Sequence, residues 1–355
     1  MKYNINHEII PQSERKAVNE KLLYLIENNL FEQFGLTKTD IFNAFTGEGG
    51  LHGLNFKEYD SFHHYTKAKK EIENGQFFTP HLLAKFLIDC LKPNKHDLVA
   101  DLTCGMGNFF NYMPNEVNVY GNELDIKAYK VARFLYPDAN ITNQDIRLYS
   151  PEISFDIVLG NPPFNLRWKV DNNEYLSQLY YCMKSYDLMN PGGIMALIVP
   201  KSFLNDDFSD GGMINEIEQK FNFICQFLLP VDSFKHNGVN HYETKIMIFQ
   251  KKSEHIAEKP FDMSFVDVEI NEKGSAFVYQ SFIAPLLDEK QKARLQLTLE
   301  IANGNQDDKD FRYKVNKLLF DIKRNPKIEK YYSKCKQYVS RYYTQTIPEL
   351  SLIHI

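Results

Sequence analysis

Apolar segments typical of strands alternate with helical segments between residues 76 and 251, and this alternation constrains the fold more than any other feature. Helical patterns over Ile126–Leu135 and Tyr175–Met189 separate strand-like segments, and Asn190–Gly193 is expected to end the second helix. Alternating strands and helices predict an α/β fold with a parallel, doubly wound sheet. The predicted strands are Leu98–Leu102, Asn118–Asn122, a short one near Ile141, Phe155–Leu159, Ile194–Val199, Phe223–Leu229 and Lys245–Gln250.

The segments on either side of this alternation differ from it. Residues Val18, Leu22 and Leu25 follow helical spacing before it, and strand signals weaken after about residue 254. We therefore expect three parts: a helical N-terminal region over 1–74, an α/β domain over 75–253, and a mostly helical C-terminal region over 254–355.

Composition bears mainly on location and partners. No apolar run is long enough to span a membrane, and the first residues lack the apolar core of a secretory signal. The five cysteines are scattered without a CxxC pair, so we expect a reduced, cytoplasmic protein with no metal site. The net charge of -5 does not itself indicate a nucleic-acid partner, so any such contact must rest on local basic patches.

A glycine turn follows the first predicted strand. The strand ends at Asp101, Gly105 and Gly107 form the turn, and a helix is expected to start near Asn108. Glycines allow a ligand to approach the backbone closely, and ligands bind at the carboxyl ends of strands in open α/β sheets. Phe110 stands where the dinucleotide fingerprint has its third glycine, which favours a sulfonium nucleoside over NAD. An ordinary tight turn is the alternative.

Two acidic residues end the next two predicted strands. Glu123 lies about 20 residues beyond the glycine turn, where a carboxylate can accept both hydrogen bonds of a ribose diol. Asp145 follows the short third strand and could accept a hydrogen bond from an adenine amino group. The alternative for both is a helix or turn cap, a role that Asp125 suits better than Glu123 does.

The segment FDIVLGNPPFN carries the strongest functional signal. A buried strand runs into Asn161, Pro162, Pro163 and Phe164, and the two prolines stiffen the loop and remove two backbone donors. The Asn161 side-chain oxygen and the Pro162 carbonyl can accept both hydrogens of an aromatic exocyclic amine, which favours a tetrahedral nitrogen with an exposed lone pair. Phe164 offers a face on which a base can stack. Such a site acts by orientation and electrostatics, without a metal.

Together these motifs resemble the N6-adenine DNA methyltransferases, including the modification subunits of type I restriction systems and related single-chain enzymes. GQFFTP (75–80), GGIMALIVPKSFL (192–204) and residues 227–251 resemble further segments of that family, and the match spans roughly 65–252. The resemblance implies a Rossmann-like sheet with an antiparallel last strand, S-adenosylmethionine as cofactor, and an adenine flipped out of double-stranded DNA. The implied cofactor-binding residues are Gln76, Phe77, Phe78, Thr79, Asp101, Thr103, Gly105, Gly107, Asn108, Glu123, Asp145 and Asn161.

Some features leave alternatives open. Leu102 replaces a proline that is frequent in the family, with little expected effect on the loop. Arg167, Trp168 and Lys169 follow the NPPF loop either as a DNA contact or as an ordinary mobile loop. The basic stretch over 309–341 can grip phosphates, dock a separate specificity subunit or form a solvated helix face.

Two other function classes compete with the DNA methyltransferase interpretation. Methyltransferases that act on RNA guanine-N2 or on protein glutamine also use an N-P-P-aromatic loop, although the FFTP segment argues against them. An inactive methyltransferase fold that only binds DNA or a partner is disfavoured by intact Asp101, Gly105, Gly107, Asn161 and Phe164.

Overall fold

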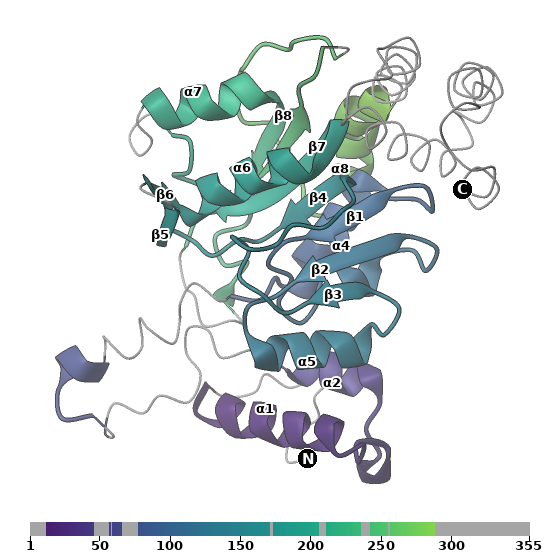
Figure 1. The fold of residues 1–355 in the computed structure, drawn as a ribbon, viewed down its shortest axis with the longest axis vertical. Helices are drawn as coiled ribbons and strands as arrows, with labels where there is room; N and C mark the ends of the chain where they lie inside the picture. The colour runs from purple at the N-terminus through teal and green to yellow at the C-terminus, as the bar shows by residue number, and fades with distance from the viewer. Residues whose placement is uncertain are drawn as a thin grey trace, which may run out of the picture.

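A seven-stranded sheet forms the centre of the protein (Figure 1). The computed structural model describes residues 12–45, 57, 59–65, 77–170, 173–205, 211–235, 242–254 and 256–287. The strands lie in the order β3-β2-β1-β4-β7-β9-β8, and only β9 runs antiparallel to the other strands, which confirms the expected sheet and its antiparallel last strand. The bounds are β1 Leu98–Asp101, β2 Asn118–Asn122, β3 Asn140–Thr142, β4 Phe155–Gly160, β7 Met189–Pro200, β8 Phe221–Leu228 and β9 Thr244–Lys251.

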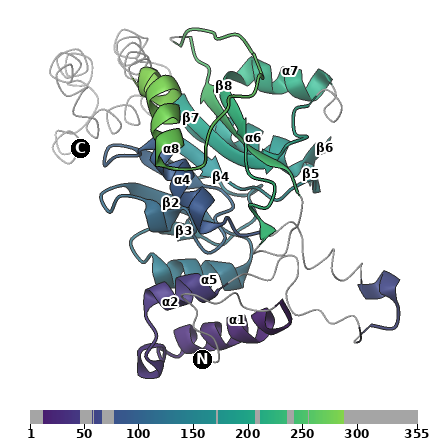
Figure 2. The ribbon, with the colours of Figure 1, turned by 180° about the vertical axis from the view of Figure 1, so that it is seen from behind.

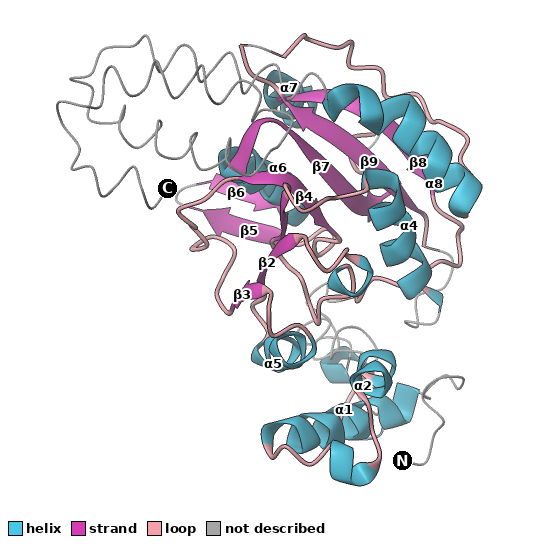
Figure 3. Ribbon diagram, turned by 90° about the vertical axis from the view of Figure 1, so that its right-hand side faces the viewer, coloured by secondary structure: helices cyan, strands magenta, loops and turns pink. Residues whose placement is uncertain are grey.

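Helices cover both faces of this sheet (Figure 3). Val99 and Ile157 pack toward α4 and α8, whereas Ala100 and Val158 pack toward α6 and α7. Burial on both faces explains why the central strands are continuous apolar runs rather than alternating ones. The helices are α1 Gln12–Glu27, α2 Lys38–Ala44, α4 His81–Leu91, α5 Ile126–Leu135, α6 Ser177–Leu188, α7 Gly211–Lys220 and α8 Glu272–Val278, with short turns at Glu32–Phe34, Phe110–Tyr112 and Tyr279–Ile283.

Two local expectations were wrong. The glycine turn is followed by the 3-10 helix Phe110–Tyr112 and not by a helix from Asn108, because Met113 precedes Pro114 and adopts an extended conformation. Asn190–Gly193 does not lie between α6 and a strand but inside β7. The pairing of β7 with β4 shifts register in this stretch, between Phe155 and Ile157, which absorbs the extra residues as a bulge.

The segment after the NPPF loop forms an antiparallel hairpin. Strand β5, Arg167–Val170, pairs with β6, Asn173–Leu176. The interpretation of these residues as an ordinary mobile loop was therefore wrong, because they belong to a paired element.

The flanking regions pack against the central domain. Helices α1 and α2 contact α5 at the β3 edge of the sheet, while α8 lies beside α4 (Figure 2). Val278, Ile283 and Leu286 are buried in the same core as α4, so the described part of the C-terminal region, 256–287, is continuous with the sheet domain. The basic stretch over 309–341 lies outside the described residues. Across the described residues, no helix combines the length and apolar character needed to cross a bilayer.

Candidate active site

The predicted motifs meet at the carboxyl ends of the central strands. Asp101 ends β1, Glu123 directly follows β2, and Asn161 directly follows β4. Strand β1 lies between β2 and β4, so the chain order reverses here, and a crevice forms outside the carboxyl ends of the strands at such a point. The topology therefore places all three polar side chains around the position where this fold class binds ligands.

Asp101 is a buried carboxylate that holds the start of the glycine turn. Its Oδ1 accepts a hydrogen bond from the Thr103 backbone N–H (3.0 Å) and lies 3.4 Å from the Tyr181 hydroxyl oxygen. Burial raises the pKa of Asp101 to about 7, although the hydrogen bond from Thr103 opposes that shift. The Thr103 hydroxyl oxygen is also buried, and it has no hydrogen-bond partner among the described residues.

Glu123 fixes the glycine turn against β2. One carboxylate oxygen accepts the Gly105 N–H and the other accepts the Asp125 N–H, both at 2.7 Å. The Asp125 side chain in turn caps α5 by accepting the Lys127 N–H (3.0 Å), so the cap role falls to Asp125 as the sequence suggested. Burial raises the pKa of Glu123 to about 7, and the two backbone hydrogen bonds oppose this shift.

Both turn glycines are required by their conformation and surroundings. Gly105 has φ +57° and Gly107 has φ +84°, in the left-handed region. A Cβ on Gly105 would lie 3.0 Å from the Phe78 ring, and one on Gly107 would lie 2.7 Å from the Tyr136 ring. The backbone of the turn is therefore close-packed on one side by aromatic rings.

The FFTP segment links the two functional loops. The Thr79 carbonyl accepts a hydrogen bond from Asn108 Nδ2 (2.7 Å) beside the glycine turn. The Phe77 carbonyl accepts one from Asn161 Nδ2 (2.8 Å) in the NPPF loop. The structure thus brings Phe77, Phe78 and Thr79 together with both motifs, whereas Gln76 lies outside the described residues.

The bond to Phe77 determines how the Asn161 amide is oriented. A carbonyl can only accept, so the amide NH₂ must face Phe77 and the side-chain oxygen must face away. That oxygen is buried and accepts no hydrogen bond from the described residues. A buried acceptor without a partner lowers the stability of the folded state, so the site is suited to a hydrogen-bond donor from outside the chain.

The rest of the NPPF loop is held by the start of α6. The Pro163 carbonyl accepts the Ser177 hydroxyl at 2.5 Å. The Phe164 ring lies nearly parallel to Tyr242, at 6.0 Å between centroids and 13°, and meets Phe234 edge-on at 6.5 Å. The loop is therefore stiff on its Pro163 side and lined by aromatic rings beyond it.

Asp145 is engaged by a neighbour. Its carboxylate binds the Arg147 guanidinium in an ion pair (2.5 Å) and also accepts the Arg147 backbone N–H (2.9 Å). The hydrogen bond from Arg147 lowers the pKa of Asp145. In this conformation Asp145 closes a turn, and its contact with an adenine amino group stays a prediction.

Sequence reasoning missed two buried residues that support the site. The Tyr181 hydroxyl accepts the Leu102 N–H (3.0 Å) and donates to the Leu159 carbonyl (2.7 Å), which ties the end of β1 to that of β4. Asn122 donates to the carbonyls of Leu102 (3.3 Å) and Gln144 (3.0 Å). A polar residue at the carboxyl end of the predicted strand 118–122 was a usable signal for Asn122, but Tyr181 carried none.

The fold is that of class I S-adenosylmethionine-dependent methyltransferases. A solved structure from Listeria monocytogenes, described as a member of that class, superposes with a TM-score of 0.51 at 15% identity. The superposition covers 78% of this chain and 91% of the Listeria chain. Within the class, the chain belongs to the N-6 DNA methylase family, whose model matches residues 58–276.

Two curated relatives are considerably longer proteins. The chain is 24% identical over 260 residues to the "Defense against restriction protein B" of Escherichia phage P1, covering 69% of this chain and 10% of the phage protein. It is also 24% identical over 260 residues to the type II restriction enzyme and methyltransferase RM.BcgI of Heyndrickxia coagulans, covering 66% of this chain and 39% of that enzyme. The chain thus matches well under half the length of these two relatives.

Proposed function

We propose that this protein transfers the methyl group of S-adenosylmethionine to N6 of an adenine extruded from double-stranded DNA. The observation that carries the proposal is the Asn161 amide, which Phe77 orients so that a buried, unpartnered oxygen faces the site. The family match supports DNA over RNA guanine or protein glutamine as the substrate. The joint presence of Asp101, Glu123 and Asn161 at one sheet edge argues against an inactive binding module.

The residues at the glycine turn fit the proposed cofactor. S-adenosylmethionine, when bound, supplies an electrophilic methyl group on a sulfonium centre. Each Glu123 oxygen accepts one backbone N–H, and a carboxylate oxygen can accept a second hydrogen bond, so a ribose diol can still be held. The unpartnered Thr103 hydroxyl is a further polar contact, and the 62% exposed Leu124 beside Glu123 offers apolar surface to a purine.

The NPPF loop fits the chemistry of an aromatic amine. The Asn161 oxygen and the Pro162 carbonyl accept the two amine hydrogens, which directs the nitrogen lone pair away from the ring. In the transfer, the bond between the methyl carbon and sulfur would break, with S-adenosylhomocysteine as the leaving group, as the bond to the amine nitrogen forms. The two carbonyl dipoles would stabilise the positive charge that develops on the nitrogen before one proton is released to water. Asn161 is neutral, so it accepts without competing as a nucleophile.

Aromatic side chains beside the loop suit an extruded base. Phe164 and Tyr242 present nearly parallel rings, and Phe234 meets Phe164 edge-on. An extruded base loses its stacking in the duplex, and stacking on aromatic side chains compensates for that loss. Base flipping is therefore part of the proposal.

Substitution of Asn161 tests the proposed mechanism. Asn161→Ala should lower methyl transfer to adenine-containing DNA by about 10²–10³, by analogy with the loss of one oxyanion donor. Its affinity for S-adenosylhomocysteine should stay close to that of the wild type, because Asn161 acts on the target amine. Asn118→Ala is the control, because Asn118 is the first residue of β2 and lies at the end of the strands away from Asn161. Near-normal turnover of Asn161→Ala would contradict the mechanism.

We further propose how the whole chain is organised. A helical region over 1–74 precedes a catalytic domain that starts at 75, and the packing of 256–287 favours extending that domain from 253 to about 287. The remaining C-terminal residues would contact DNA or a separate specificity subunit in the cytoplasm. Co-purification of the full chain with a second subunit that confers sequence preference on methylation tests the partner.

A further inference from the structure

Two residues, Asn165 and Leu166, separate the NPPF loop from the β5–β6 hairpin, which has two different faces. Trp168 and Tyr175 pair across the strands, and both rings contact Tyr180 on α6, at 5.8 Å and 6.0 Å between centroids. Adjacent residues of a strand point to opposite faces, so Arg167 and Lys169 lie on the face opposite Trp168. The apolar face thus packs on the body of the protein, which leaves the charged face outward.

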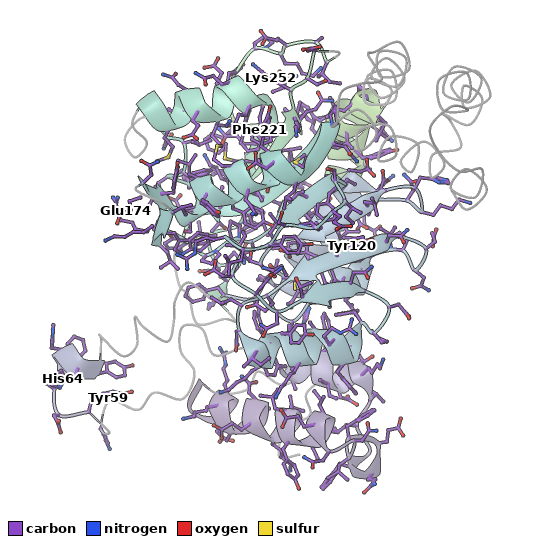
Figure 4. All side chains as sticks on the ribbon, viewed as in Figure 1. Tyr59, His64, Tyr120, Glu174, Phe221 and Lys252 are labelled. Atoms are coloured by element: carbon purple, nitrogen blue, oxygen red, sulfur yellow. The ribbon has the colours of Figure 1, made fainter. Side chains whose placement is uncertain are left out.

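The outward face carries exposed cationic groups. The Arg167 side chain is 66% exposed and forms an ion pair with Glu174 at 3.1 Å. Lys169 is exposed and lies opposite Glu174 in the strand register. Glu174 projects from the outer side of the hairpin (Figure 4). An exposed ion pair is worth at most about 1 kcal/mol, so a phosphate can replace Glu174 at little cost.

Arg147, whose charge is paired with Asp145, holds the hairpin in place. Its Nη1 donates to the Lys169 carbonyl (3.2 Å), while its Nε and Nη2 bind the Asp145 carboxylate. The Arg147 side chain is 44% exposed. The hairpin is therefore anchored, and its described residues carry Arg167 and Lys169 beside the single carboxylate of Glu174.

The base of the hairpin is bonded to the NPPF loop. Ser177 follows β6 directly, its N–H donates to the Leu166 carbonyl (2.8 Å), and its hydroxyl donates to the Pro163 carbonyl (2.5 Å). Asn165 adopts φ +57° and exchanges two hydrogen bonds with Gln178, at 3.1 Å and 2.9 Å. Displacing the hairpin would therefore displace the loop that holds the target base.

We propose that Arg167 and Lys169 bind backbone phosphates of the DNA strand that carries the target nucleotide. The proposal rests on the proposed function, because it takes the NPPF loop as the base-binding site. The occupant is a phosphodiester backbone, since the face offers one planar guanidinium and one ammonium beside the position of an extruded nucleotide. Because Ser177 bonds the hairpin to the NPPF loop, the phosphate contact and the extruded base keep a fixed position relative to each other.

Salt-dependent DNA binding tests this proposal. The full chain with S-adenosylhomocysteine is titrated with a fluorescent duplex over a series of salt concentrations, without turnover. Each phosphate contact contributes about 0.9 to the slope of log K against log salt, so Arg167→Gln/Lys169→Gln should lower the slope by about 1.8. Cofactor affinity should stay unchanged. Lys95→Gln, in the exposed turn before β1 at the opposite edge of the sheet, is the matched control.

Glu174→Gln separates phosphate binding from a structural ion pair. Removing the competing carboxylate should maintain or strengthen DNA binding, whereas a structural role for the Arg167–Glu174 pair predicts a loss as large as that of Arg167→Gln. Such a loss, or an unchanged slope in the double variant, overturns the proposal. A wild-type chain whose DNA binding shows the hairpin-dependent salt slope, but which methylates no DNA, would refute only the proposed function. A wild-type chain that binds no DNA would overturn the phosphate-binding proposal, and the methylation assay tests the proposed function separately.

Discussion

The Tyr181 hydroxyl offers a sharp test of how the site is held together. Tyr181 is fully buried. Its hydroxyl accepts a hydrogen bond from the Leu102 N–H at 3.0 Å and donates one to the Leu159 carbonyl at 2.7 Å. Tyr181→Phe keeps the ring but leaves a donor and an acceptor without partners at the ends of β1 and β4. A buried group that loses its partner costs about 1–3 kcal/mol, so the free energy of unfolding should fall by about 2–4 kcal/mol after partial relaxation.

Urea unfolding of the wild type and of Tyr181→Phe measures this loss. Tyr175→Phe is a matched control, because the Tyr175 hydroxyl makes no hydrogen bond among the described residues and should cost less than about 0.5 kcal/mol. The affinity for S-adenosylhomocysteine should also fall in Tyr181→Phe, since the hydroxyl lies 3.4 Å from Asp101. Equal stability of the two variants would refute the assignment of Tyr181 as the link between β1 and β4.

Three further predictions follow from the cofactor loops. The pKa of Glu123 is raised to about 7, and the ionised form accepts hydrogen bonds from the ribose hydroxyls. The affinity for S-adenosylhomocysteine, measured by calorimetry, should therefore fall as the pH drops below 7. Glu123→Gln should flatten that pH dependence. For Asp101 the folded pKa, about 7, exceeds the ordinary value of 3.8, so the folded state binds more protons between these values and stability falls as pH rises through that window. Asp101→Asn should remove that fall, on the order of 4 kcal/mol, in urea unfolding across the pH range; an unchanged profile would contradict the burial argument. Gly105→Ala should cost about 1–2 kcal/mol of stability and weaken cofactor binding, because of its φ of +57° and the Phe78 ring 3.0 Å from the new Cβ.

Local sequence patterns predicted most of the fold. Strands β1 and β4 are buried on both faces, so Leu98–Ala100 and Ile157–Leu159 are short continuous apolar runs that stand out in the sequence. The positions of Glu123 and Asn161 followed from the same reasoning, because residues that directly follow parallel strands meet at one sheet edge.

Contacts between distant segments were beyond local patterns. The hydrogen bond from Asn161 to the Phe77 carbonyl joins segments far apart in the chain, and only the packing of α4 against the sheet brings them together. Tyr181 occupies an ordinary helical position in sequence, and its role depends on where α6 crosses the strand ends. The engagement of Asp145 by Arg147 likewise depends on side-chain geometry that spacing does not determine.

Analysis of the methylated product tests the central claim most directly. The full chain is incubated with S-adenosylmethionine labelled in its methyl group and with double-stranded DNA, RNA or protein in parallel, and the DNA is then digested to nucleosides. The account predicts label in N6-methyl-2′-deoxyadenosine from DNA, lost in Asn161→Ala, and no label in RNA or protein. Label in a guanine of RNA or a glutamine of protein, with none in DNA adenine, would contradict it.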